Sequence, residues 1–114
     1  MKAKVVQLDG VAAFPLAPGV SGRPLFGDDV MFNLVECEPG AVVELHSHPH
    51  EQLGVILHGS LTLVIDGEPH ELGPMQAVAL PSGIEHSAVA GPDGAVMLDV
   101  FTPVREDYRD KLSS

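Results

Sequence analysis

Apolar and polar positions alternate along most of this chain in short runs, and the pattern predicts strands rather than long helices. Runs with apolar residues at every second position, or nearly continuous apolar runs, are separated by glycine, proline and aspartate. This is typical of β-strands joined by tight turns. The predicted strands are residues 30–38, 41–46, 52–58, 60–65, 76–80 and 95–101. Helix is predicted only for the short polar segment 104–112.

Turn signals between these runs indicate antiparallel pairing. Asp66-Gly67 separates LTLVI from EPHEL, and an Asp-Gly pair favours a type I′ hairpin because both central residues need positive φ. Further breaks contain Pro39-Gly40 and Pro92-Asp93-Gly94. Closely spaced strands with such turns predict an all-β antiparallel sandwich or barrel.

Length and composition fit one small domain. The 114 residues predict a single domain over 1–114. Cys37 is the one cysteine, so no intrachain disulfide can form and a reduced, cytoplasmic setting is expected. The apolar runs are too short for a signal peptide or a membrane span, so no membrane association is expected.

The charge distribution is more informative than its sum. A net charge of −10 argues against a nucleic-acid partner. Neither lysine nor arginine occurs from Pro24 to Val104. Arg105 is therefore a conspicuous cation if the end of the chain folds back onto the barrel.

Three histidines and a glutamine carry the densest chemical signal. His46 and His48 are two apart, so on a strand they share a face. Gln52 follows a short turn at the start of the next apolar strand, and His86 follows Pro81-Ser-Gly83. Three imidazoles and one oxygen donor form a recognised site for Zn, Ni, Mn or Fe. The predicted metal ligands are His46, His48, Gln52 and His86.

These segments resemble the paired motifs of the cupin superfamily. The first motif, G-x5-H-x-H-x3/4-E-x6-G, is matched with Gln in place of Glu by Gly40, His46, His48, Gln52 and Gly59. The second, G-x5-P-x-G-x2-H-x3-N, is matched by Pro81, Gly83 and His86, whereas Met75 and Ala90 depart from it. The resemblance implies a double-stranded β-helix (jelly-roll) barrel with a short C-terminal helix or extension.

The motif also separates ligands from neighbours. Glu51 would restore a carboxylate ligand, but its strand parity points it to the face opposite Gln52. His50, His58 and His70 fall outside the motif, so surface or core positions are expected for them.

With Gln52 as the oxygen ligand, the site would keep the full charge of a divalent ion. Such an ion is a strong Lewis acid and attracts an anionic substrate.

The last predicted strand places a carboxylate among apolar residues. Met97, Asp99 and Phe101 share one face of it. An aspartate is costly to bury without a partner. An edge position, a pair with an arginine, or a general acid/base role at the cavity would each explain it.

The chain is similar at this point to a group of small cupins that linearise 4,5-unsaturated monouronates in pectin and alginate breakdown. Those enzymes hold their metal with three histidines and one glutamine and carry a terminal D-x-F-x3-R pattern, which Asp99, Phe101 and Arg105 match. The resemblance implies that Asp99 moves a proton, Arg105 neutralises the substrate carboxylate and Phe101 packs against the sugar. Met75-Gln76 and Gly54-Val55 depart from the group's usual residues.

The expected function is therefore a metal-dependent isomerase- or lyase-like reaction on a small anionic substrate, a uronate. The alternatives are a cupin dioxygenase, a polyketide-cyclase-like enzyme, and a sugar- or effector-binding cupin without turnover, because one fold hosts many functions. A homodimer is expected, since exposed strand edges must be covered.

Overall fold

A computed structural model describes residues 1–113 and shows an antiparallel β-barrel with one short terminal helix. The expected all-β jelly-roll fold with a C-terminal helix is confirmed. The elements are η1 (Leu8–Gly10), β1 (Phe14–Ala17), β2 (Val20–Phe26), β3 (Met31–Cys37), β4 (Val42–His46), β5 (Glu51–Ile65), β6 (Glu68–Leu72), β7 (Ala77–Leu80), β8 (His86–Thr102) and α1 (Glu106–Ser113). None of the helices within residues 1–113 is long and apolar enough to cross a membrane.

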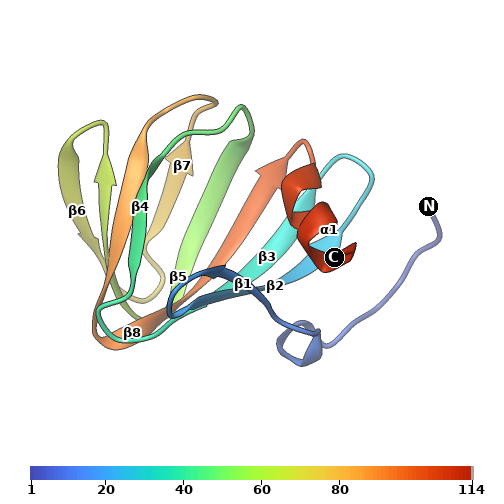
Figure 1. The fold of residues 1–114 in the computed structure, drawn as a ribbon, viewed down its shortest axis with the longest axis horizontal. Helices are drawn as coiled ribbons and strands as arrows, with labels where there is room; N and C mark the ends of the chain where they lie inside the picture. The colour runs from blue at the N-terminus through green and yellow to red at the C-terminus, as the bar shows by residue number, and fades with distance from the viewer. Residues whose placement is uncertain (114) are drawn as a thin grey trace.

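Two long strands, β5 and β8, belong to both layers of the barrel (Figure 1). The first half of β5 pairs with the second half of β8, and the sheet continues through β3 and β2 to β1, with β7 on the other side of β5. The second half of β5 pairs with the first half of β8, flanked by β6 and β4. The two layers face each other across the core.

Bends in the two long strands explain where the sequence prediction differs. The segments 52–58 and 60–65 are one strand, bent at Gly59 with register shifts on either side. The predicted strand 95–101 is the second half of β8, and Pro92-Asp93-Gly94 is a bend inside β8 rather than a turn that ends it. Glycine at a strand bend allows a backbone conformation that other residues resist.

The first two strands were not predicted, whereas the hairpin was. β1 and β2 contain Pro15, Gly22 and Pro24, which weaken the sequence signal for strands. The hairpin from β5 to β6 turns at Asp66 and Gly67, whose φ angles are 48° and 85°, as a type I′ turn requires.

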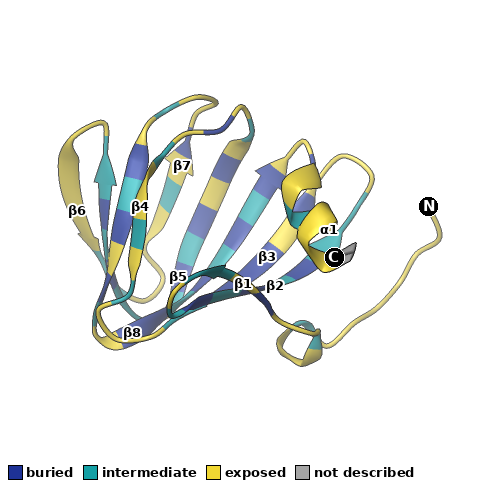
Figure 2. Ribbon diagram, viewed as in Figure 1, coloured by how far each residue is buried: buried dark blue, intermediate teal, exposed yellow. Residues whose placement is uncertain are grey.

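The core lies between the two layers and follows the alternation of the strands. Buried and exposed residues alternate as bands along β5 and β8 (Figure 2). Ile56, Leu61, Leu63 and Met97 belong to the main buried cluster. A second cluster beneath α1 contains Met31, Phe101 and Val104. Since Phe101 also faces the barrel interior, this second cluster fixes the end of the chain against one end of the barrel.

We expect Gly59→Ala to destabilise the fold more than Gly67→Ala. Both glycines have positive φ, which costs another residue roughly 1–2 kcal/mol. A Cβ at Gly59 would also collide with the backbone carbonyl of Gly94, whereas one at Gly67 meets nothing within 4 Å. Urea unfolding of both variants measures the difference. Equal losses would mean that the close approach of β5 and β8 at Gly59 contributes nothing.

Candidate metal centre and active-site cavity

Three histidines from separate segments meet at one end of the barrel. His46 ends β4 and His86 begins β8, and the two are register partners in the sheet. His48 lies on the connection to β5 and is buried. Candidate ligand atoms of the three side chains all lie within 4.8 Å of one another. The predicted histidines are therefore brought together, in a group that could hold a metal ion.

Backbone carbonyls set the tautomer of each ring. Nδ1 of His46 lies 2.8 Å from the carbonyl oxygen of Glu44, Nδ1 of His86 lies 2.9 Å from that of Ile84, and Nδ1 of His48 lies 3.0 Å from that of His50. A carbonyl oxygen only accepts, so each Nδ1 carries the proton. Each Nε2 is then left with its lone pair, as in histidines that bind metals through this atom.

The Gln52 side chain completes a set of lone pairs that suits a cation. Gln52 is buried on β5, whereas Glu51 is exposed, as strand parity predicted. Oε1 of Gln52 lies 3.1 Å from Nε2 of His48. Both atoms are acceptors here, because Nδ1 holds the proton of His48. Ligands at about 2.0–2.2 Å from one ion lie roughly 3 Å apart, so a bound divalent ion fits this spacing and would remove the repulsion.

The buried imidazoles favour their neutral form. Burial is the largest cause that lowers the pKa of His48, and the charge of Arg105 lowers it further. Burial likewise lowers the pKa of His86 below its usual value, and His46 adds to the effect. A neutral imidazole offers the lone pair that a metal needs.

Asp99 faces the same interior and forms no ion pair with another of the residues 1–113. It lies in β8 between β3 and β5, opposite Gly54, so it does not occupy an edge. The side chain is 7% exposed, and its Oδ1 has no hydrogen-bond partner within residues 1–113. Burial raises its pKa to about 7, against the lowering influence of the Gln52 amide and Arg105.

Arg105 is held at the cavity by a different carboxylate. Nε and Nη2 of Arg105 donate to Oδ1 and Oδ2 of Asp107 at 3.0 and 2.8 Å. The guanidinium lies 5.0 Å from the ring centre of Phe101 and 4.1 Å from that of Tyr108, within the range of cation–π attraction. A guanidinium has five N–H donors, so donors remain for a ligand.

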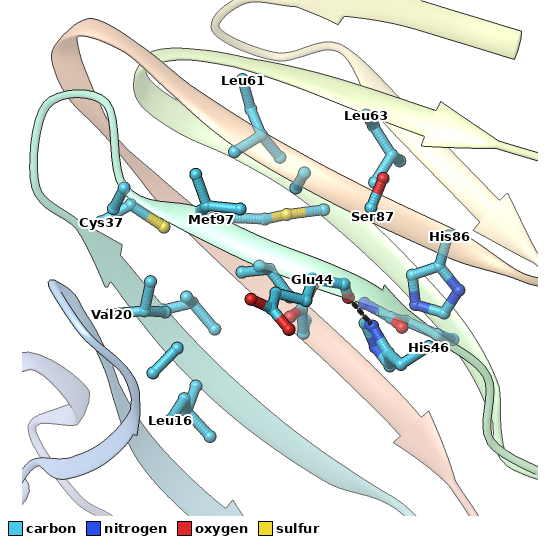
Figure 3. Close-up of a pocket in the computed structure, with 18 of the residues that line it drawn as sticks. Leu16, Val20, Cys37, Glu44, His46, Leu61, Leu63, His86, Ser87 and Met97 are labelled. Atoms are coloured by element: carbon cyan, nitrogen blue, oxygen red, sulfur yellow. Dashed lines mark hydrogen bonds between the residues drawn. The ribbon is translucent and has the colours of Figure 1, made fainter. Parts of the chain in front are cut away.

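One cavity of about 840 Å³ unites these groups. His46, Gln52, His86, Asp99, Phe101 and Arg105 all line it. His48 stands beside it, with its ring centre 5.0 Å from that of His86 and 5.6 Å from that of Phe101. Figure 3 shows His46 and His86 at one end of this cavity, with the hydrogen bond from His46 to Glu44 drawn as a dashed line. The arrangement combines a candidate cation site, a buried carboxyl and a guanidinium.

Several neighbours of the site were not predicted from the sequence. Asp107 and Tyr108 hold Arg105, and the ring of His50, expected outside the site, lies 5.6 Å from that of His48. Asn33 is fully buried, faces Asp99 across β3 and β8, and has no partner for its amide atoms within residues 1–113. The position of Asn33 within the apolar run MFNLV was the available sequence signal, because an amide, like the Asp99 carboxylate, is costly to bury without a partner.

Comparison with known proteins finds a pectin degradation protein and a lyase among the relatives. The chain is 32% identical over 84 residues to the pectin degradation protein KdgF of Dickeya dadantii, covering 73% of this chain and 76% of that protein. It is 33% identical over 75 residues to the dimethylsulfoniopropionate lyase DddW of Ruegeria pomeroyi, covering 66% of this chain but 49% of that protein.

Solved structures and a family model agree with these relatives. The structure of KdgF from Halomonas sp. superposes with a TM-score of 0.84 at 26% identity, covering 95% of this chain and 99% of that one. The cupin domain model matches residues 33–101, which contain most of β3, all of β4 to β7 and nearly all of β8. That span also holds all four predicted metal ligands. The protein therefore belongs to the cupin family.

Proposed function

We propose that this protein is a metal-dependent enzyme that linearises a 4,5-unsaturated monouronate or a closely related carboxylated sugar. The observation that carries the proposal is the shared cavity, in which His46, His86 and Gln52 meet Asp99 and Arg105, with His48 grouped beside the other two histidines. The similarity to KdgF proteins supports the substrate class. A purely structural pair of Asp99 and Arg105 is less compatible with the geometry, because Arg105 forms its ion pair with Asp107.

The ligand set would be His46, His48, Gln52 and His86, with Zn, Ni, Mn or Fe as suitable ions because no redox change is needed. When bound, such an ion supplies Lewis acidity that stabilises negative charge developing on substrate oxygens. The Gln52 amide is neutral, so the site keeps the ion's full charge for an anionic substrate. Gln52 also faces Asp99 and thereby links the ligand set to the proton-transfer group.

Asp99 is the proposed proton carrier. Its Oδ1 is buried, faces the cavity wall near Gly54 and has no partner in the described chain. When the sugar ring opens, the anomeric hydroxyl loses its proton as it becomes an aldehyde, and the bond between the anomeric carbon and the ring oxygen breaks with its electrons on that oxygen. The resulting enolate becomes a ketone when its far alkene carbon gains a proton. A single carboxyl that takes the first proton and delivers one to the carbon balances the tautomerisation.

Arg105 and Phe101 would bind and orient the substrate. The N–H groups of Arg105 that Asp107 leaves free can grip a carboxylate. Asp107 would act as a positioning residue, because its bidentate bond fixes the guanidinium plane. Phe101 is 2% exposed and packs against His48 and Arg105, so its proposed contact with the sugar is limited to the ring edge at the cavity.

A second candidate reaction is β-elimination from a small carboxylate. The similarity to a dimethylsulfoniopropionate lyase favours it. Asp99 would then remove a proton from the carbon next to the carboxylate, while the leaving group departs from the neighbouring carbon with its bonding electrons.

A direct assay distinguishes uronate linearisation from β-elimination. The metal-loaded protein is given unsaturated monouronates derived from pectin and from alginate, and dimethylsulfoniopropionate in parallel. We expect loss of the uronate's conjugated absorbance at a rate that depends on added metal. Turnover of dimethylsulfoniopropionate alone would replace the first candidate by the second. No turnover of either, with tight binding of a uronate, would indicate a binding protein.

We expect Gln52→Glu to keep or strengthen metal binding and to weaken activity on anionic substrates. A carboxylate ligand would cancel part of the ion's charge and so reduce its attraction for an anion. Chelator competition measures metal affinity, and kcat/KM on a uronate measures the second effect. The exposed neighbour gives the matched control, Glu51→Gln, which should change neither. Equal or higher activity of Gln52→Glu would overturn the electrostatic argument.

A further inference from the structure

The cavity has two chemically different ends. The polar end holds His46, His86, Gln52, Asp99 and Arg105. The other end, here called the chamber, is walled by Leu16, Val20, Val35, Leu61, Leu63 and Met97. Figure 3 shows Leu16, Val20 and Met97 away from His46 and His86, across the space between the layers. These residues come from both layers of the barrel, so the chamber lies inside the fold.

Glu44 and Ser87 also line the cavity, but the six residues that wall the chamber offer nothing that could bind hydroxyls. Its cavity-lining thiol, Cys37, has a pKa raised to about 11 by burial and by the charge of Asp99, so it is a neutral thiol at physiological pH. Leucine, valine and methionine side chains give a sugar hydroxyl nothing to hydrogen-bond, and burial of a hydroxyl without a partner costs free energy. An alkyl or aryl group, by contrast, gains from leaving water at such a surface.

The cavity is also large for a single sugar acid. About 840 Å³ lies in the upper part of the range found for sites that bind drug-sized molecules. A monouronate bound through its carboxylate at the polar end would leave the chamber to water, against apolar walls that hold it poorly.

We propose that this site takes carboxylates that carry an apolar substituent, with the carboxylate at the histidines and the aliphatic or aromatic group in the chamber. The carboxylate end of this inference rests on the proposed metal site, whereas the chamber end rests on the cavity walls alone. It names a substrate class beyond plain sugar acids, including uronates substituted with an apolar group.

Binding of a homologous series tests the chamber without any turnover. Acetate, butanoate, hexanoate and octanoate are titrated calorimetrically into the zinc-loaded protein. We expect the dissociation constant to fall by about fourfold per methylene until the chamber is filled, the ratio that corresponds to about 0.8 kcal/mol per buried methylene. Dissociation constants that do not change with chain length would overturn the inference.

A variant that fills the chamber locates the effect. Ala88 on β8 lines the cavity and is 6% exposed, so Ala88→Leu should reduce the advantage of octanoate over acetate at least tenfold. The matched control is Ala79→Leu on the exposed side of β7, which should behave like the original protein. If Ala88→Leu does not fold, Ala41→Leu at the partly buried cavity wall replaces it. If the dissociation constant of the filled variant still fell with chain length, the alkyl tails would bind at the outer surface. That result would refute the chamber as their binding site.

The titrations distinguish failure of the proposed metal site from failure of the chamber inference. If acetate binds no more tightly with zinc than without it, the proposed metal site fails. If acetate binding depends on zinc but longer chains gain nothing, the metal site stands and the chamber inference fails alone.

Discussion

Asp99→Asn is expected to reduce turnover on a 4,5-unsaturated uronate by about 10²–10⁴-fold, the usual contribution of general acid–base catalysis. Asparagine keeps the size and shape of the side chain but cannot accept and deliver a proton. Substrate affinity should change little, because Arg105 and the ligand set are untouched. Steady-state kinetics on the metal-loaded variant give kcat and KM separately, and the loss should fall on kcat.

A companion substitution shows whether the loss is specific to proton transfer. Arg105→Lys keeps the charge but loses the planar fork that grips a carboxylate, so it should raise KM more than it lowers kcat. A fall mainly in kcat for Asp99→Asn and a rise mainly in KM for Arg105→Lys would assign catalysis to Asp99 and binding to Arg105. If both variants changed kcat and KM to the same extent, the two residues would act as one structural unit.

Thermal stability supplies the control for Asp99. Burial raises the pKa of Asp99 to about 7, well above its ordinary value. A raised carboxyl pKa means that the protonated form favours folding, and that this contribution is lost as the pH rises toward 7. Asparagine removes the ionisable group, so the melting temperature at pH 8 should stay equal or rise. A clear fall in melting temperature would instead point to a structural role and contradict the catalytic one.

The strands that follow simple alternation could be predicted, whereas those broken by glycine and proline could not. β3, β4 and β7 lie within a residue or so of the predicted ranges, because one face of each is apolar. β2 contains Gly22 and Pro24, and it fits against β3 with Gly22 leaving room for the buried Asn33 side chain, which a Cβ at this position would meet. That contact lies outside any local pattern. For the same reason, the continuity of β5 through Gly59 depends on the backbone of Gly94 far along the chain.

The candidate ligands could be predicted because they lie at short spacings within two segments of the sequence. The cavity could not be predicted, because residues far apart in the sequence form it together. His46 ends β4 and His48 follows two residues later, and Pro81 to His86 span a tight turn, so the motif alone brought out the set. The pairing of Arg105 with Asp107 depends on where α1 packs, which the sequence does not reveal. The chamber requires side chains from both layers at once, and so it becomes visible only in the folded barrel.

His46→Ala is expected to weaken zinc binding by more than 100-fold. Loss of a group that merely orients a ligand costs about 10–100-fold in metal affinity, and loss of a ligand itself should cost more. His46 is chosen because it is only partly buried, so its removal disturbs packing less than removal of His48 or His86. Competition with a chromogenic chelator measures the affinity, and uronate turnover should fall in parallel.

Stability in the presence of metal provides an independent readout with a matched control. An ion that binds only the folded protein raises its melting temperature by mass action, so zinc should stabilise the original protein and not His46→Ala. His58→Ala removes an exposed histidine of β5 that does not line the main cavity, and it should retain the full stabilisation. If His46→Ala bound zinc as tightly as His58→Ala, His46 would not be a ligand. The three-histidine geometry would then need another explanation, because the orientation of its Nε2 lone pair by Glu44 would serve no ion.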